Sequence, residues 1–342
     1  MTDETLHDRV LLGALPDLAA AFDLPEVREH WFLAEGLMNL NWRIDTERAS
    51  YAVKRITDMP VAKVRRNLGV LSHLAADGLP VPAPLSTLDG KHVVEVADHH
   101  YCVLPWVEGV HMPGIALAAG QAHELGVLLA RLHDSLKGHG PGPLPEQSPT
   151  AKVTASDQAA AAADRLLTLI PQDSADSFDQ AAAHALQERK ILLDKHADAR
   201  PVSSVPVGPY GWTHGDFQYR NLLWNDAHVV AILDWDRLAV RPYAEEVART
   251  AQVQFGVDGR FDLERVAAFV AGYRSLLPLT AEELADGVER LWWKRMTDFW
   301  QLEFHYDRGD AGCDDLFLAD EELLVWWTGH RDDVQAAFQA AP

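Results

Sequence analysis

Two carboxylates and a carboxamide stand close together in the stretch WTHGDFQYRNLLWNDAHVVAILDWD, which covers residues 212–236. Asp216 is followed five positions later by Asn221, and Asp234 comes thirteen positions after that amide. Mg²⁺ prefers oxygen ligands and often shares them with substrate phosphates. Phosphoryl transfer needs little besides a metal, a positioned hydroxyl and a cation on the phosphates. The stretch therefore suits phosphoryl transfer, with Asp216 able to take the hydroxyl proton and with Asn221 and Asp234 on the metal.

The apolar runs NLLW and VVAIL on either side of this turn predict two strands. Their pairing between Leu222 and Leu233 would bring the polar groups at their ends together. A different chemistry is compatible with the same residues, namely a metal hydrolase whose ligands are His214, Asp216, Asp234 and Asp236. For Asp236 a surface position is also open.

The elements around this stretch predict an α+β protein. The chain starts with a helical pattern over 4–22, continues with strand-like alternation over 30–56 and returns to helical spacing over 61–77. Two further strands are expected in KHVVEV and HYCVLPW. From about residue 115 the pattern is mostly helical, with one long helix over 281–307. The sequence therefore predicts a small strand-rich N-terminal part, the front lobe, and a large helical C-terminal part, the back lobe. Ligands favour the cleft between two such lobes.

The motif HGDFQYRN followed by ILDWD resembles the catalytic loop and the metal-binding segment of the aminoglycoside phosphotransferase and choline kinase superfamily, small-molecule relatives of protein kinases. The resemblance implies a bilobal protein-kinase-like fold that uses ATP and Mg²⁺. It makes Asp216 the catalytic base and His214 the brace of the loop. It makes Asn221 and Asp234 the metal ligands. Gln218 stands where the family often has a second histidine.

A strand lysine is the next part that such a kinase needs, and SYAVKRI supplies Lys54. The resemblance makes Lys54 the phosphate lysine and makes 35–41 the loop over the nucleotide, with Gly36 and Asn39 in contact with it. A metal hydrolase would not explain this combination of a hairpin and a lysine.

The segment YCVLPWVEG resembles the last strand and the hinge of the front lobe. The carbonyl of Pro105 could accept from the adenine amino group, and the N–H of Val107 could donate to the ring. The expected organisation is an N-terminal nucleotide-binding lobe over 1–104, a hinge over 105–109 and a catalytic, acceptor-binding lobe over 110–342.

One position departs from the family. The strand lysine of the family pairs with a glutamate on the following helix, but residues 60–76 contain no acid, and Asn67 falls where that glutamate is expected. Either Asn67 holds Lys54 by a neutral hydrogen bond, or an acid elsewhere does so.

The acceptor is expected to be a small molecule. After DWD the chain runs directly into RLAVRPYAEEVA, without the long segment that accepts peptides in protein kinases. We expect an aminoglycoside-like antibiotic or another natural product, and hence a role in antibiotic resistance. The alternatives are a metabolic kinase of an amino alcohol such as choline or homoserine, and an inactive nucleotide-binding pseudokinase.

Acidic side chains near the C-terminus are candidates for binding a cationic acceptor. The stretch DFWQLEFHYDRGD interleaves carboxylates with aromatic rings, and the resembling enzymes wall the acceptor site with their C-terminal helices. Glu303 and Asp307 share a helix face and are the better candidates, with Asp298 beside them.

Composition sets the remaining expectations. The chain has 342 residues and a formal net charge of −21 at pH 7. A surface with this much negative charge repels nucleic acid and anionic lipid. We therefore expect neither as a partner. Two distant cysteines do not form a disulfide framework, and the polar start has no apolar core for export. We expect a soluble cytoplasmic protein, and the sequence leaves its oligomeric state open.

Overall fold

The computed structural model describes residues 3–34, 39–57, 59–171 and 176–340. The chain divides into two compact units, each assembled from separate segments. The first, here called the sheet unit, comprises Met1–Met112, Arg131–Pro143 and His214–Ala239. The second, the helical unit, comprises Pro113–Ala130, Leu144–Thr213 and Val240–Pro342. The lobe boundaries expected at residues 104 and 110 stay a prediction.

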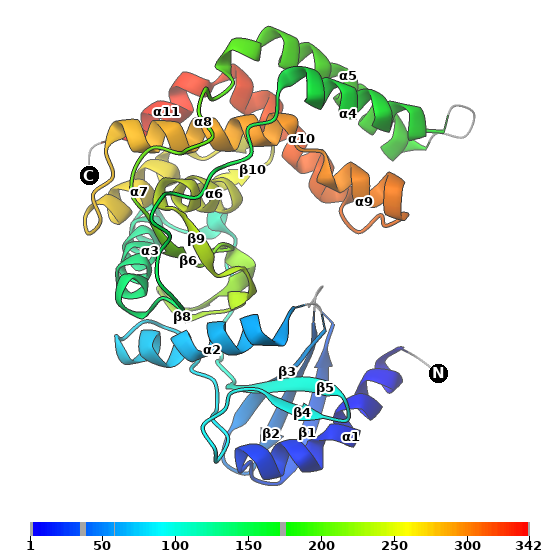
Figure 1. The fold of residues 1–342 in the computed structure, drawn as a ribbon, viewed down its shortest axis with the longest axis vertical. Helices are drawn as coiled ribbons and strands as arrows, with labels where there is room; N and C mark the ends of the chain where they lie inside the picture. Colours follow the sequence, from blue (N-terminus) through cyan, green and yellow to red (C-terminus); the bar gives the residue numbers. More distant parts are fainter. Residues whose placement is uncertain (1–2, 35–38, 58, 172–175, 341–342) are drawn as a thin grey trace. The chain divides into compact units, whose positions relative to one another are not determined.

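An antiparallel sheet is the centre of the sheet unit. Within the described residues its five strands follow the order β1-β2-β3-β5-β4 (Figure 1). Their bounds are Val27–Leu33 for β1, Leu40–Thr46 for β2, Ser50–Ile56 for β3, Val94–Val96 for β4 and His99–Pro105 for β5. These strands confirm the alternating pattern of the sequence, although β4 occupies only the last half of KHVVEV.

Helix α1 (Asp3–Phe22) packs against this sheet. Its apolar residues recur every three or four positions, so that they form one stripe along the helix. Strand residues contribute every second side chain to the same core, as the pleat requires. The shared core contains Leu11, Ala14, Leu18, Phe22, Trp42, Ile44, Val53, Val96, Tyr101 and Val103, all buried.

The sheet unit also contains helix α2 (Val61–Ala76) and a hairpin of β7 (Leu222–Asn225) and β8 (His228–Ile232). The hairpin is antiparallel and pairs Leu222 with Ile232. The predicted strand pair is therefore present, and it brings the two polar ends of the 212–236 stretch to the same end of the hairpin.

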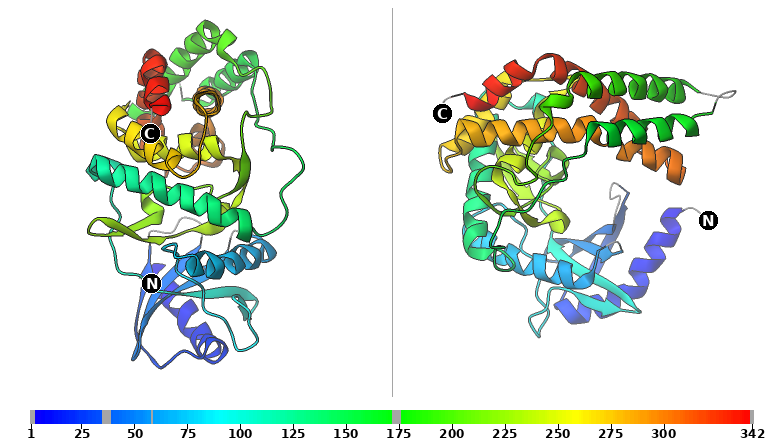
Figure 2. Two further views of the ribbon diagram at one scale, coloured as in Figure 1. Left: turned by 90° about the vertical axis from the view of Figure 1, so that its left-hand side faces the viewer. Right: turned by 45° about the horizontal axis from the view of Figure 1, so that its top comes forward.

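The helical unit consists mainly of helices, as expected. Helices α4 and α5 run side by side in Figures 1 and 2. A short sheet joins β6 (Tyr210–Thr213) to β9 (Ala239–Pro242), and a second one joins β10 (Gly256–Val257) to β11 (Arg260–Phe261). The helices are α3 (Ala119–His139, which continues into the sheet unit), α4 (Ser156–Leu169), α5 (Ser177–Lys195), α6 (Tyr243–Phe255), α7 (Leu263–Arg274), α8 (Ala281–Thr297), α9 (Trp300–Arg308), α10 (Asp314–Gly329) and α11 (Arg331–Gln339).

The single long helix expected over 281–307 is wrong, because α8 ends at Thr297 and α9 begins at Trp300. Asp298 between them is extended, with φ −109° and ψ 130°. The buried guanidinium of Arg189 donates to the carbonyls of Arg295, Met296 and Asp298 at 2.7, 3.3 and 3.2 Å. A cation on the last carbonyls of a helix satisfies groups that have no intrahelical partner. Arg189 thus stabilises the end of α8.

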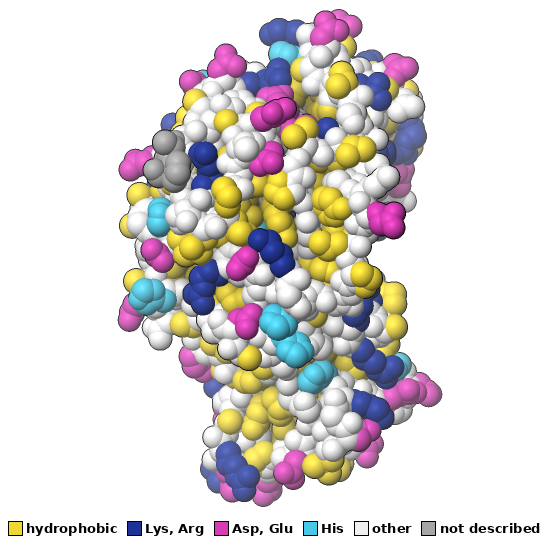
Figure 3. Space-filling view, turned by 60° about the vertical axis from the view of Figure 1, so that its left-hand side comes forward, with side chains coloured by type: hydrophobic (Ala, Val, Ile, Leu, Met, Phe, Trp, Pro, Cys, Tyr) yellow, Lys and Arg dark blue, Asp and Glu magenta, His cyan; other side chains and the backbone are white. Residues whose placement is uncertain are grey.

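The surface, the hydrophobicity of the helices and the state of the cysteines bear on the expectations drawn from composition. On the face shown in Figure 3, acidic, basic and hydrophobic side chains are intermixed. No helix among the described residues is long and apolar enough to cross a membrane. Cys102 and Cys313 are both free, and burial raises the pKa of the Cys102 thiol to about 11, so that it stays protonated near neutral pH.

Candidate active site

His214 connects the two polar segments of the 212–236 stretch. It is fully buried, and its Nδ1 accepts a hydrogen bond of 3.2 Å from the backbone N–H of Asp216. Its other nitrogen therefore carries the proton and donates to the carbonyl of Leu233 at 2.9 Å. Gly215, which stands between His214 and Asp216, has φ +83°, a conformation that favours glycine. Since both ring nitrogens bond to backbone, His214 fits the expected bracing role.

Asp216 lies at the centre of a small amide network. Its Oδ2 accepts from Gln218 Nε2 at 2.9 Å and from Asn221 Nδ2 at 3.2 Å. The same Asn221 nitrogen donates to the Asp216 carbonyl at 2.8 Å. Both residues are about nine-tenths buried. Two amide donors on one oxygen fix the orientation of the carboxylate, as a general base requires.

Asn221 and Asp234 suit the role of metal ligands. The nitrogen of Asn221 makes the bonds to Asp216, which leaves the side-chain oxygen available. Asp234 follows β8 in a left-handed conformation, with φ +56° and ψ 79°, and its side chain is 47% exposed. Asp tolerates this conformation better than most residues. A hard cation such as Mg²⁺ takes carboxylate and amide oxygens, so this donor set fits it.

The hydrolase alternative does not fit the geometry. Within the described part of the chain, no group of three or more His, Cys, Asp and Glu side chains is placed to hold a metal ion. His214, one of the four ligands which that alternative needs, already bonds to backbone through both nitrogens.

Lys54 points toward the acids that follow β8. Its Nζ lies 2.8 Å from Asp236 Oδ2 and 3.9 Å from Asp234 Oδ1. The Lys54 and Asp236 side chains are only 20% and 18% exposed. Burial lowers the pKa of Lys54, but the Asp236 and Asp234 carboxylates together more than offset it, so the pKa lies above its ordinary value. The lysine therefore stays charged near neutral pH.

Asn67 is not the partner of Lys54. Its Nδ2 donates instead to the carbonyl of Trp235 at 2.8 Å, and it is 2% exposed. Of the two possibilities left open by the sequence, an acid elsewhere pairs with the lysine. That acid is Asp236. Asn67 links α2 to the segment that follows Asp234 by a hydrogen bond between uncharged groups, and its assignment as a nucleotide contact stays a prediction.

Asn39 joins the same group from the start of β2. Its Nδ2 donates to Asp236 Oδ2 at 3.0 Å, and its Oδ1 accepts from the backbone N–H of Thr57 at 3.2 Å. Gly36, the other residue expected over the nucleotide, lies outside the described residues. Asn39 is thus adjacent to the lysine through their shared acceptor.

The expected hinge leaves backbone groups available for a base. Trp106 N–H bonds to the carbonyl of Ser50 at 3.0 Å, while Pro105 is paired with Tyr51. Because bonded and non-bonded pairs alternate in antiparallel strands, the Pro105 carbonyl points away from β3. The Val107 N–H forms no hydrogen bond with another described residue. The adenine contacts expected of these two groups stay a prediction.

The sequence indicated two residues of the site only weakly. Gln218 bonds directly to Asp216, and its position two residues later is the signal that could have indicated it. Asp236 is the partner of Lys54, and its position two residues after Asp234 was the only indication of this in the sequence.

The three acids expected at the acceptor all have partners within the helical unit. Asp307 makes a bidentate ion pair with Arg165 of α4, at 2.8 and 3.1 Å, and Glu303 lies 3.6 Å from the same guanidinium. These side chains are 40–48% exposed. The Arg165 guanidinium lowers the pKa of the Asp307 carboxyl, so it is charged near neutral pH. An acceptor role for this pair stays a prediction.

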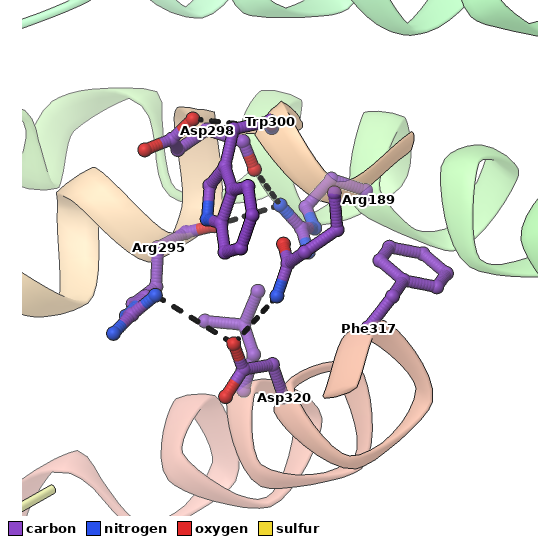
Figure 4. A pocket seen from close by; sticks show the side chains of 8 residues that line it. Arg189, Arg295, Asp298, Trp300, Phe317 and Asp320 are labelled. Carbon is purple, nitrogen blue, oxygen red and sulfur yellow. Dashed lines mark hydrogen bonds and ion pairs between the residues drawn. The ribbon is translucent and has the colours of Figure 1, made fainter. Parts of the chain in front are cut away.

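Asp298 lines a small pocket where α5, α8, α9 and α10 meet (Figure 4). Its carboxylate accepts from the backbone N–H of Trp300 at 3.3 Å. The charges around it are balanced, because Arg189 pairs with Glu321 and Arg295 lies 3.6 Å from Asp320. The lining residues are Arg189, Arg295, Asp298, Trp300, Gln301, Phe317, Asp320 and Leu324.

Known proteins resemble this chain along most of its length. The model of the phosphotransferase enzyme family matches residues 31–279. A homoserine kinase of Azorhizobium caulinodans is 26% identical over 286 residues, which are 82% of this chain and 81% of that protein. One of Beijerinckia indica is 27% identical over 279 residues, 79% of this chain and 78% of that protein.

A solved structure with the same fold is spectinomycin phosphotransferase in complex with ADP and spectinomycin. It has a TM-score of 0.61 at 16% identity and covers 96% of this chain and 98% of its own. The similarity supports the protein-kinase-like α+β fold that the sequence predicted. Because the family model spans well over half of the sequence, this chain belongs to the phosphotransferase enzyme family, as a small-molecule kinase.

Proposed function

We propose that this enzyme phosphorylates the hydroxyl of a small amino alcohol of the homoserine type, with ATP and Mg²⁺. The observation that carries the proposal is the similarity to curated homoserine kinases across about four-fifths of both chains. The antibiotic acceptor that we expected first is less well supported, because the antibiotic kinases resemble this chain in fold at 16–17% identity. An aminopropanol kinase shares that fold as well, with a TM-score of 0.59 at 17% identity.

The residues of the sheet unit have separate roles in this reaction. The Asp216 carboxylate, held by Gln218 and Asn221, would accept the proton of the acceptor hydroxyl. Lys54 would bind the phosphates of the nucleotide. Asn221 and Asp234 would hold Mg²⁺, which supplies charge neutralisation on the phosphates. The presence of Asp216, Asn221, Asp234 and Lys54 also argues against the pseudokinase alternative, since these are the residues proposed as base, metal ligands and phosphate lysine.

The test is a phosphorylation assay with purified protein, ATP and Mg²⁺, read by mass spectrometry of the acceptor. L-homoserine, choline, 1-amino-2-propanol and spectinomycin would be compared at equal concentrations. We expect L-homoserine or a near analogue to have the highest kcat/KM. Preferred phosphorylation of spectinomycin would contradict the acceptor class while leaving the kinase chemistry intact.

Matched variants connect the activity to the site. Asp216→Asn removes the base and leaves the size of the side chain unchanged. Asp226→Asn is the control, because Asp226 lies in the turn between β7 and β8 and is exposed. Only the first variant should lose product formation.

A further inference from the structure

We propose that Asp236 is the positioning residue of Lys54 and that it takes the place of the helix acid missing from α2. The Nζ of Lys54 lies 2.8 Å from Asp236 Oδ2, although 182 positions separate the two residues in sequence. Residues 60–76 contain no acid at all. Asn67, the nearest equivalent on the helix, is bonded elsewhere.

The pair is partly buried, so a charged partner stabilises the lysine. An ammonium withdrawn from water costs free energy unless an opposite charge with good geometry accompanies it. Asp234 is at 3.9 Å and is needed for the metal, so it cannot also hold the lysine at hydrogen-bonding distance. Asp236 supplies the charge at 2.8 Å and leaves Asp234 available.

Asp236 is itself held in place by neutral amides. Asn39 donates to the same Oδ2 at 3.0 Å, and Asn67 fixes the preceding residue through the carbonyl of Trp235 at 2.8 Å. Asn39 and Asn67 are both buried, at 8% and 2% exposure. The lysine, the start of β2 and helix α2 therefore all converge on one short segment, Trp235 and Asp236. In this enzyme the metal-binding segment sets the position of the phosphate lysine.

If Asp236 positions Lys54, its replacement should affect nucleotide binding differently from the loss of a metal ligand or of a purely structural acid. Asp236→Asn should weaken binding of Mg²⁺·AMP-PNP by about 10²-fold, because a displaced lysine no longer meets the phosphates. Adenosine, which has no phosphates, should bind as before. Asp236→Glu should restore part of the lost affinity. Asp89→Asn is the control, since it removes the exposed partner of Lys91 in the same unit.

A double-mutant cycle with Lys54→Met separates the explanations. If Asp236 acts through the lysine, Asp236→Asn should have no further effect on Mg²⁺·AMP-PNP affinity once Lys54→Met is present. The double variant also lacks the unpaired buried charge, so it stays testable even if Asp236→Asn alone does not fold.

Three results would overturn the proposal. They are a further loss of affinity in the Lys54→Met background, equal or tighter nucleotide binding by Asp236→Asn, and full recovery of that variant at high Mg²⁺. The readout is calorimetric binding without any acceptor. A negative result therefore leaves the homoserine-type assignment untouched, and a wrong acceptor class does not affect this test.

Discussion

The imidazole of His214 donates from Nε2 to the carbonyl of Leu233 at 2.9 Å, one residue before Asp234, the proposed metal ligand. The other ring nitrogen accepts from the N–H of Asp216. One buried side chain therefore links the backbone at Asp216, the proposed base, to the backbone just before Asp234, and these two hydrogen bonds fix its neutral tautomer.

Replacing His214 by Phe should destabilise the protein and lower its activity together. The change removes the hydrogen bonds of His214 to the Asp216 N–H and to the Leu233 carbonyl, at a cost of about 1–3 kcal/mol for each buried bond. Chemical denaturation of the variant beside His228→Phe, an exposed position on β8, measures the difference. Equal midpoints for the two variants would contradict the bracing role.

Asp216→Ala should retain nucleotide binding and lose turnover by roughly 10²–10⁴-fold, the usual contribution of a general base. Steady-state kinetics with the acceptor identified by the screen would measure kcat, and calorimetry would measure nucleotide affinity. Normal turnover with that acceptor would show that another group takes the proton.

Asp234→Asn should raise the Mg²⁺ concentration needed for half-maximal activity. The backbone should keep its conformation, because Asn also tolerates the φ of +56° found here. Asn221→Ala should have a milder effect, since a neutral ligand is lost rather than a charge. Titration of activity with Mg²⁺ measures both shifts. Wild-type activity that persists in excess chelator would refute metal-dependent phosphoryl transfer.

Asn67→Ala should lower the free energy of unfolding by about 1–3 kcal/mol, because the buried Trp235 carbonyl loses its donor. Asn67→Glu should be worse, although the family has glutamate here, because a carboxylate would face that carbonyl oxygen. Urea denaturation of both variants gives the comparison. A neutral or stabilising Asn67→Glu would mean that the glutamate reaches Lys54 after all.

Neutralising Glu303 or Asp307 should raise the KM for a cationic acceptor and leave that for ATP nearly unchanged. Arg165→Gln is the matched control, because it removes the cation that both carboxylates contact and should lower the KM or leave it unchanged. The ion pair itself is exposed, so its contribution to stability is about 0–1 kcal/mol. A KM that rises in all three variants would indicate instead that the position of α9 matters.

Local spacing in the sequence predicted most of the elements around the candidate site and which residues stand at the ends of its strands. The alternation before Ile56 predicted strands of the sheet, and the apolar runs NLLW and VVAIL predicted the hairpin with Asn221 and Asp234 at its end. Such features depend on neighbours within a few residues along the chain, where the periods of strands and helices act.

Only the tertiary structure decided which partner each of these groups has. Several acids were equally available to Lys54 by sequence, and Asp236 was selected because the fold places it 2.8 Å away. Likewise the carbonyls at the end of α8 accept hydrogen bonds from Arg189, more than a hundred positions earlier. A shift of a few ångströms would break such a contact. Its distance is set by the packing of elements far apart in the sequence, which a local pattern does not encode.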